Sequence, residues 1–122
     1  MTDAPAIVWT GGSPDGPTAA LEDRGLFVAA DGRPDGGGIP LSAARMCETF
    51  RSAFFTYLEC RSEPGNALER AAGDVDRLAV EEGIRRGGRA SASIAAAFAG
   101  PEGLWWVSAG SCAVVVGAGG RR

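Results

Sequence analysis

The sequence predicts an α+β fold in which two long helices cover one face of an antiparallel sheet. Two strand-like segments precede the helices, and short strands separated by turns follow them. Strands joined by tight turns rather than by helical crossovers favour antiparallel pairing. At 122 residues, of which 45% are hydrophobic and 22% charged, the chain is expected to form one domain over residues 1–122.

The segments ahead of the helices are short and rich in residues that favour strands or turns. Ala6–Thr10 is β-branched and aromatic, which predicts a strand. Thr18–Leu21 is expected to be a short extension or a strand. Glu22–Gly25 has the composition of a turn. The apolar run Leu26–Ala30 then predicts a buried strand.

That strand leads directly into an acid and a glycine, Asp31 and Gly32. A buried strand carries its last residue to the edge of the core, where a carboxylate can face water or a metal ion. The glycine lets the backbone pass close to whatever the carboxylate holds. Asp-Gly is also a common turn dipeptide, so the pattern by itself leaves a turn and a metal ligand as alternatives.

Two amphipathic helices are predicted in the middle of the chain. The first opens at Pro40, and its apolar residues recur at steps of three and four. Ser62 is a candidate cap for the second, which runs to about Glu82 and is ended by Gly83 and Gly87–Gly88. The apolar stripe of the first helix comprises Leu41, Met46, Cys47, Phe50, Phe54, Tyr57 and Leu58.

The last third of the chain predicts a meander of three strands. Ser91–Phe98 is small and almost continuously apolar, which is typical of a strand buried on both faces. Gly100–Gly103 predicts a hairpin turn, Leu104–Ser108 the next strand, and Cys112–Val116 the third. The neighbours Trp105 and Trp106 must point to opposite sides of their strand, so one is expected to meet the helices.

Composition disfavours several classes of function. The net charge of −3 argues against a nucleic-acid binder, and no run of 18 apolar residues predicts a membrane span. The N-terminus lacks the features of a signal peptide, so we expect a cytoplasmic protein with reduced cysteines. There is no histidine and no Cys-x-x-Cys pair, which disfavours zinc sites and histidine-based catalysis.

Taken together, the order of elements and three motifs resemble the metal-dependent protein serine/threonine phosphatases of type 2C. The likeness covers roughly residues 18–120 and depends on the order and spacing of the motifs more than on any one of them. The first match is Gly25–Gly32 followed by Gly36–Gly38, which resembles the family's Ala-Asp-Gly strand and Gly-Gly-Glu helix start. The second is Ser91–Phe98, which resembles its Thr-Thr-Leu-Val-Ala-Ala strand. The third is Leu104–Cys112, which resembles its Leu-Tyr-Val-Ala-Asn-Val-Gly-Asp-Ser hairpin.

The resemblance implies a fold, a metal centre and two site residues. The family's fold is an αββα sandwich, in which two antiparallel sheets pack face to face with helices outside. Its chemistry uses two Mg or Mn ions that activate a water molecule to attack phosphorus. Asp31 matches the carboxylate that bridges the metals, and Gly32 matches the glycine whose carbonyl helps to hold one of them.

Most of the family's other ligands have no counterpart in this sequence. Ser111 stands at the aspartate of Gly-Asp-Ser, and Ile39 at the glutamate of Gly-Gly-Glu. The family's Arg-x-x-Asn-Glu-Asp segment has no match near Asp15, although Glu22-Asp23 offers an alternative acidic pair. The remaining carboxylates would lie beyond Arg122, so we expect a truncated domain equivalent to half of the sandwich.

We therefore expect a weak magnesium or manganese site or none, because one carboxylate cannot hold two divalent ions. The resemblance then implies a phosphatase 2C-like domain that lacks catalysis, a pseudophosphatase, and acts by binding a protein. The alternative is an active phosphatase whose site is completed by another subunit or by a missing C-terminal half. Half a sandwich leaves one sheet face for a partner, with Trp9, Trp105 and Trp106 as candidates for that face. We favour a homodimer, because symmetric pairing is the commonest assembly. A nucleophilic enzyme using Ser111 or Cys112 has little support, since no base is identifiable nearby.

Overall fold

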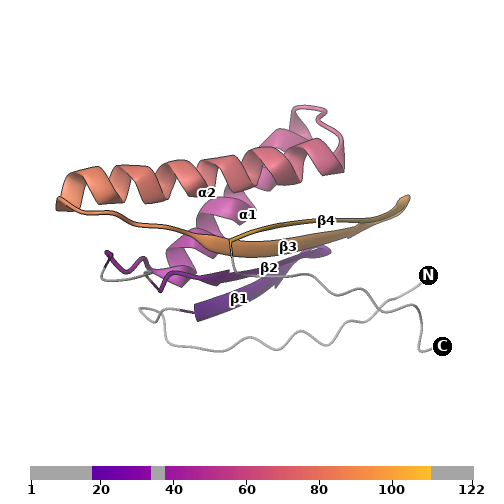
Figure 1. Ribbon diagram of the computed structural model, residues 1–122. Helices are drawn as coiled ribbons and strands as arrows, with labels where there is room; N and C mark the ends of the chain where they lie inside the picture. The colour runs from indigo at the N-terminus through magenta and orange to yellow at the C-terminus, as the bar shows by residue number, and fades with distance from the viewer. Residues whose placement is uncertain (1–17, 34–37, 111–122) are drawn as a thin grey trace.

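The structure is a computed structural model that describes residues 18–33 and 38–110 (Figure 1). Its elements, in chain order, are the strands β1 (Thr18–Asp23) and β2 (Leu26–Asp31), the helices α1 (Ala43–Glu59) and α2 (Pro64–Arg86), and the strands β3 (Ser93–Gly100) and β4 (Gly103–Ala109). The predicted α+β class is therefore confirmed. The predicted strands Ala6–Thr10 and Cys112–Val116, together with Trp9, Asp15, Ser111 and Cys112, lie outside the described residues.

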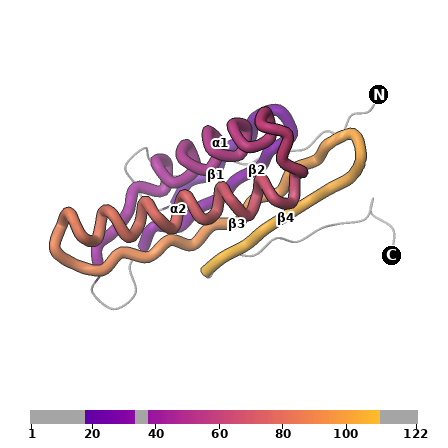
Figure 2. Tube along the Cα trace, turned by 90° about the horizontal axis from the view of Figure 1, so that it is seen from above, coloured from indigo at the N-terminus to yellow at the C-terminus, as the bar shows by residue number. Residues whose placement is uncertain are grey.

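The four described strands form one antiparallel sheet in the order β1-β2-β3-β4. The central pair, β2 and β3, is separated in the sequence by both helices, and Val28 lies opposite Ala96 across that pair. Figures 1 and 2 show both helices on the same face of the sheet. Helix α1 packs on β1 and β2, and α2 packs on β4 and β3, as the predicted two-layer arrangement requires.

The hydrophobic core lies between the sheet and the two helices. Alternate residues of each strand point toward the helices, because successive side chains of a strand face opposite sides. Phe54 is completely buried at the centre of the core, where its ring packs against Phe98 with 4.9 Å between the ring centroids. The largest fully buried side chains are Phe50, Phe54, Leu26, Met46, Leu68, Ile94, Val75 and Cys47.

Both helices begin at residues other than those predicted. Helix α1 begins at Ala43 instead of Pro40, because the Ser42 hydroxyl caps it by accepting a hydrogen bond from the Arg45 backbone N–H at 3.2 Å. The prediction that Ser62 caps α2 is wrong. The N-cap residue is Glu63, whose side chain makes no capping hydrogen bond, and Pro64 occupies the first turn, where a missing N–H costs nothing.

Helix α2 also continues past the predicted end at Glu82. Gly83 lies inside the helix and is buried, and a Cβ there would lie 2.9 Å from the carbonyl oxygen of Gly88. The glycine thus allows the returning chain to pass close to the helix, and it does not end the helix. The helix ends where Gly87 adopts the left-handed conformation, with φ of 74°.

The two tryptophans of β4 lie on opposite faces of the sheet, as their spacing predicts. Trp105 is partly buried and packs beside Phe98, with 6.3 Å between the ring centroids. Trp106 faces away from the helices and is 56% exposed. We refer to the side of the sheet away from the helices as the outer face.

Candidate functional site

Asp31 is the last residue of β2, and it lies on the outer face at one end of the sheet. Its cross-strand neighbours are Thr18 on β1 and Ser93 on β3, so a hydroxyl side chain stands on each side of the carboxylate. Residues directly opposite one another in antiparallel strands point to the same face. Thr18, Asp31 and Ser93 therefore bring one carboxylate and two hydroxyl groups together on this face.

The Asp31 carboxylate forms an ion pair with Arg33, two residues further along the chain. The guanidinium of Arg33 donates from Nη2 to Oδ2 at 2.6 Å, and its Nε lies 3.0 Å from Oδ1 and 3.1 Å from Oδ2. The Arg33 backbone N–H adds a hydrogen bond to Oδ1 at 2.9 Å. These hydrogen bonds from Arg33 lower the pKa of Asp31, because they stabilise its charged form.

Gly32 is needed where two stretches of backbone cross. Its carbonyl oxygen accepts a hydrogen bond from the Leu41 N–H at 2.9 Å, and a Cβ on Gly32 would collide with the Leu41 carbonyl oxygen. The crossing ties the end of β2 to the segment that leads into α1. The glycine that resembles a metal ligand therefore has a structural reason of its own to lack a side chain.

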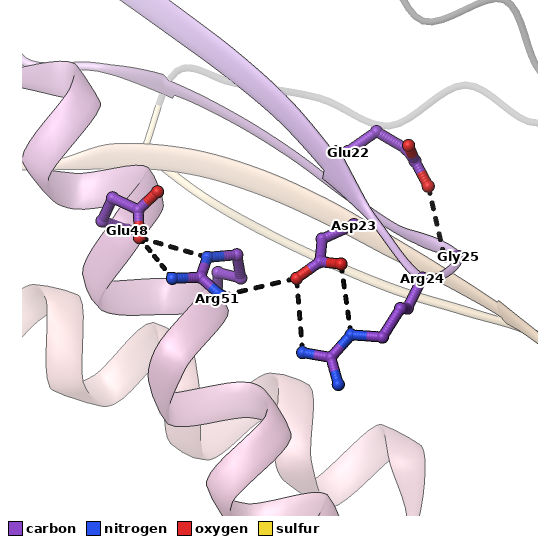
Figure 3. Close-up of polar contacts among 6 residues, drawn as sticks. All are labelled: Glu22, Asp23, Arg24, Gly25, Glu48 and Arg51. Atoms are coloured by element: carbon purple, nitrogen blue, oxygen red, sulfur yellow. Dashed lines mark hydrogen bonds and ion pairs between the residues drawn. The ribbon is translucent and has the colours of Figure 1, made fainter.

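The alternative acidic pair, Glu22 and Asp23, lies at the turn between β1 and β2 (Figure 3). Asp23 accepts hydrogen bonds from Arg24 at 3.1 and 3.3 Å and from Arg51 of α1 at 3.4 Å. The carboxylate of Glu22 accepts a hydrogen bond from the Gly25 N–H at 3.4 Å. These contacts stabilise the β1–β2 hairpin and fasten it to α1. The predicted turn Glu22–Gly25 is too long, because Glu22 and Asp23 pair with β2 as the last residues of β1, and only Arg24 and Gly25 form the turn.

This acidic pair stands at the opposite end of the hairpin from Asp31. Asp23 is paired with Leu26, and Asp31 follows Leu26 by five residues along β2. Five residues of a strand span about 17 Å. Oxygen ligands lie only about 2.0 to 2.6 Å from a bound magnesium or calcium ion, so neither acid can share such a cation with Asp31 in this arrangement.

The described part of the chain contains no group of three or more histidine, cysteine, aspartate or glutamate side chains that could hold a metal ion. Asp31 and the carbonyl of Gly32 offer two oxygens at one position. A hard divalent cation prefers about six oxygen ligands, and a two-metal centre needs several carboxylates. As described, these residues do not fit the magnesium or manganese centre that the resemblance implies.

The outer face of the sheet presents an apolar surface made largely of small side chains. Trp106 is 56% exposed and Leu104 40% exposed, both on β4, and Phe27 lies on the same face in the middle of the sheet. The register places these apolar residues together on the outer face: Ala20, Phe27, Ala29, Ala95, Ala97, Ala99, Leu104 and Trp106.

The sequence predicted part of this arrangement. It identified Trp106 or Trp105 as the outward tryptophan, but not the alanines around it, because a continuous run of small apolar residues does not reveal which face each one takes. It also missed the pairing of Asp31 with Arg33, for which the signal is a basic residue two positions after the acid, where a turn brings the side chains together.

Comparison with known proteins gives no relative from which a function could be transferred. No family model matches the chain, and no curated protein or solved structure matches it either. The described helices include none that is long and apolar enough to cross a membrane.

Proposed function

We propose that this chain is a phosphatase 2C-like domain without phosphatase activity, which acts by binding a protein through the outer face of its sheet. The order of the elements supports the proposal, since two helices packed on one side of an antiparallel sheet form one half of an αββα sandwich. We expect it to act in the cytoplasm, in keeping with the free thiol of the exposed Cys60.

The state of Asp31 supports the absence of catalysis. Metal-dependent phosphoryl transfer needs cations to activate water and to neutralise the developing charge. Here the carboxylate that resembles the bridging ligand is bound to Arg33 through three side-chain hydrogen bonds. A cation would have to displace that guanidinium before Asp31 could serve as a ligand.

The observation that carries the binding role is the apolar outer face. Trp106 and Leu104 expose large apolar side chains, and Phe27 and the alanines of β2 and β3 continue the apolar surface across the sheet. Large apolar side chains exposed together on one face favour association, because covering them removes apolar area from water.

We propose a second copy of the chain as the partner. The bulky residues Leu104 and Trp106 stand on β4 at one side of the outer face, while Ala20 stands on β1 at the other. A two-fold axis parallel to the strands would place β4 of each copy over β1 of the other, so that each copy covers the exposed Leu104 and Trp106 of its partner. Two sheets stacked in this way at about 10 Å complete a sandwich.

Light scattering of the full chain at tens of micromolar tests this assignment. We expect a mass of twice the 12.4 kDa of one chain for the wild type, and a monomer for Trp106→Glu, which places a charge in the interface. Ile84→Ser is the matched control, because Ile84 is 78% exposed on α2 in the other layer. It should remain dimeric.

A wild-type chain that is cleanly monomeric overturns the homodimer. A dimer that Trp106→Glu leaves intact excludes the outer face as the interface. Manganese-dependent turnover by the full chain would favour the alternative of an active phosphatase completed by another subunit.

A further inference from the structure

A cluster of arginines surrounds one buried carboxylate where the end of α2 meets the start of α1. Glu82 is 7% exposed, and both of its oxygens accept hydrogen bonds from Nη2 of Arg85, at 2.6 and 2.7 Å. Arg45 of α1 adds a hydrogen bond to the same carboxylate at 3.1 Å, and Arg86 approaches it to 3.9 Å. Figure 2 shows these ends of the two helices at the same end of the molecule.

The charges in this cluster do not balance. Arg85 contacts both carboxylate oxygens and compensates the charge of Glu82, so Arg45 and Arg86 bring two further positive charges to the same place. Like charges held close together repel, and the chain as a whole carries a net charge of −3. A local excess of positive charge in an acidic protein favours the binding of an anion.

A small pocket lies beside the two excess cations. Its volume is about 130 Å³, and it is lined by Leu41, Ser42, Arg45, Leu78, Glu82 and Arg86. The pocket thus combines two guanidinium groups and a hydroxyl with an apolar wall from two leucines. It is large enough for a tetrahedral oxyanion and too small for a nucleotide.

Hydrogen bonds hold both arginines in place and leave donors available. Arg45 donates from Nη1 to Glu82, and Arg86 donates from Nη1 to the Pro40 carbonyl at 3.2 Å. A guanidinium carries five N–H donors in a fixed plane, so each side chain keeps further N–H groups for a ligand. The pocket also adjoins the start of α1, whose first turn contains no acidic residue to offset the helix dipole.

We propose that this pocket binds a phosphate group between the guanidiniums of Arg45 and Arg86, with Glu82 holding the arginines in position. Guanidinium forks match the oxygens of phosphate, and two excess positive charges match its charge. The site lies in the helical layer, so it is on the opposite side of the sheet from the outer face, where Asp31 lies. Its ligand is either free phosphate or the phosphate of a phosphorylated side chain, because the pocket has room for that group alone.

Titration of the full chain at low ionic strength tests the site, since salt screens exposed guanidiniums. Calorimetry with inorganic phosphate, a phosphoserine peptide and the unphosphorylated peptide should give saturable binding for the first two probes. Tighter binding of the phosphopeptide would identify a phosphorylated side chain as the source, and equal binding would identify the free anion. Loss of one arginine contact should weaken binding at least about tenfold.

Arg86→Gln and Arg45→Gln are the test variants, and Arg86→Lys should restore part of the affinity because it keeps the charge. Arg77→Gln is the matched control, since Arg77 lies on α2 and pairs with Asp74 at 3.0 Å, away from the pocket. Circular dichroism confirms that each variant is folded. The proposal is overturned if wild type gives no saturable response up to about 10 mM of either phosphate probe, a limit that covers millimolar affinity. It is overturned equally if Arg77→Gln loses as much affinity as Arg86→Gln.

Discussion

Arg33 forms a forked ion pair with Asp31, in which Nη2 lies 2.6 Å from one carboxylate oxygen and Nε lies 3.0 Å from the other. The pair is local, because the two residues are separated by Gly32 alone. The side chain of Asp31 is 19% exposed and that of Arg33 66% exposed, so the pair lies at the surface at one end of the sheet. The acid that resembles a metal ligand is thus already bound to a cation of the protein itself.

Replacing Arg33 with glutamine is expected to raise the pKa of Asp31 toward its ordinary value of 3.8. Arg33 lowers that pKa in the folded protein, so the ion pair stabilises the fold at pH values above the ordinary pKa. This stabilisation is lost as the pH falls through the lowered pKa. An NMR titration of the Asp31 side-chain carboxyl carbon measures the change. Arg77→Gln is the control and should leave the titration of Asp31 unaltered. An unchanged curve in Arg33→Gln would contradict the pairing.

Gly32→Ala is expected to destabilise the fold by about 1 to 3 kcal/mol or more, because the new methyl group meets the backbone of Leu41, which cannot move aside easily. Gly73→Ala is the matched control. Gly73 lies in α2, and a methyl group added there would meet no atom within 4 Å, so alanine should stabilise the helix by up to about 1 kcal/mol. Urea unfolding of both variants measures the difference. Equal effects at the two glycines would refute the close crossing at Gly32.

Trp105→Ala and Trp106→Ala are expected to differ sharply although the residues are adjacent. Trp105 is partly buried beside Phe98 and below the first turn of α2, so its removal should cost about 2 to 3 kcal/mol. Trp106 is 56% exposed, and its removal should change the stability of the monomer by less than about 0.5 kcal/mol. Thermal unfolding must be measured at a protein concentration at which the chain is monomeric, since association adds stability. A larger loss for Trp106→Ala would reverse the assignment of faces.

The sequence predicted the layers of the fold because they depend on periodicity. The apolar positions of both helices, the strand ending at Asp31 and the opposite faces of Trp105 and Trp106 all follow from side-chain repeats. The helix boundaries were less predictable. Gly83 resembles a helix end in the sequence, but it lies inside α2, and it lacks a side chain because Gly88 passes too close for one. Such close approaches depend on the returning chain and leave no local signal.

The arginine cluster shows why part of the site could not be predicted. The spacing of Glu82 and Arg86 is visible in the sequence, yet the stronger contact is made by Arg85, three residues after Glu82. Arg45 joins the cluster from 37 positions away, and only the packing of α1 on α2 brings it there. Asp31 was identified correctly as the last residue of its strand, while its partner Arg33 depends on the conformation of the turn.

We propose that this domain acts by binding and not by phosphoryl transfer. The most direct measurement is hydrolysis of p-nitrophenyl phosphate by the full chain with added manganese, compared between wild type and Asp31→Asn. Because Asp31 is paired with Arg33, and the described residues contain no group of three or more side chains that could hold a metal ion, we predict no manganese-dependent turnover in either protein. Manganese-dependent turnover in wild type that is lost in Asp31→Asn would contradict the account.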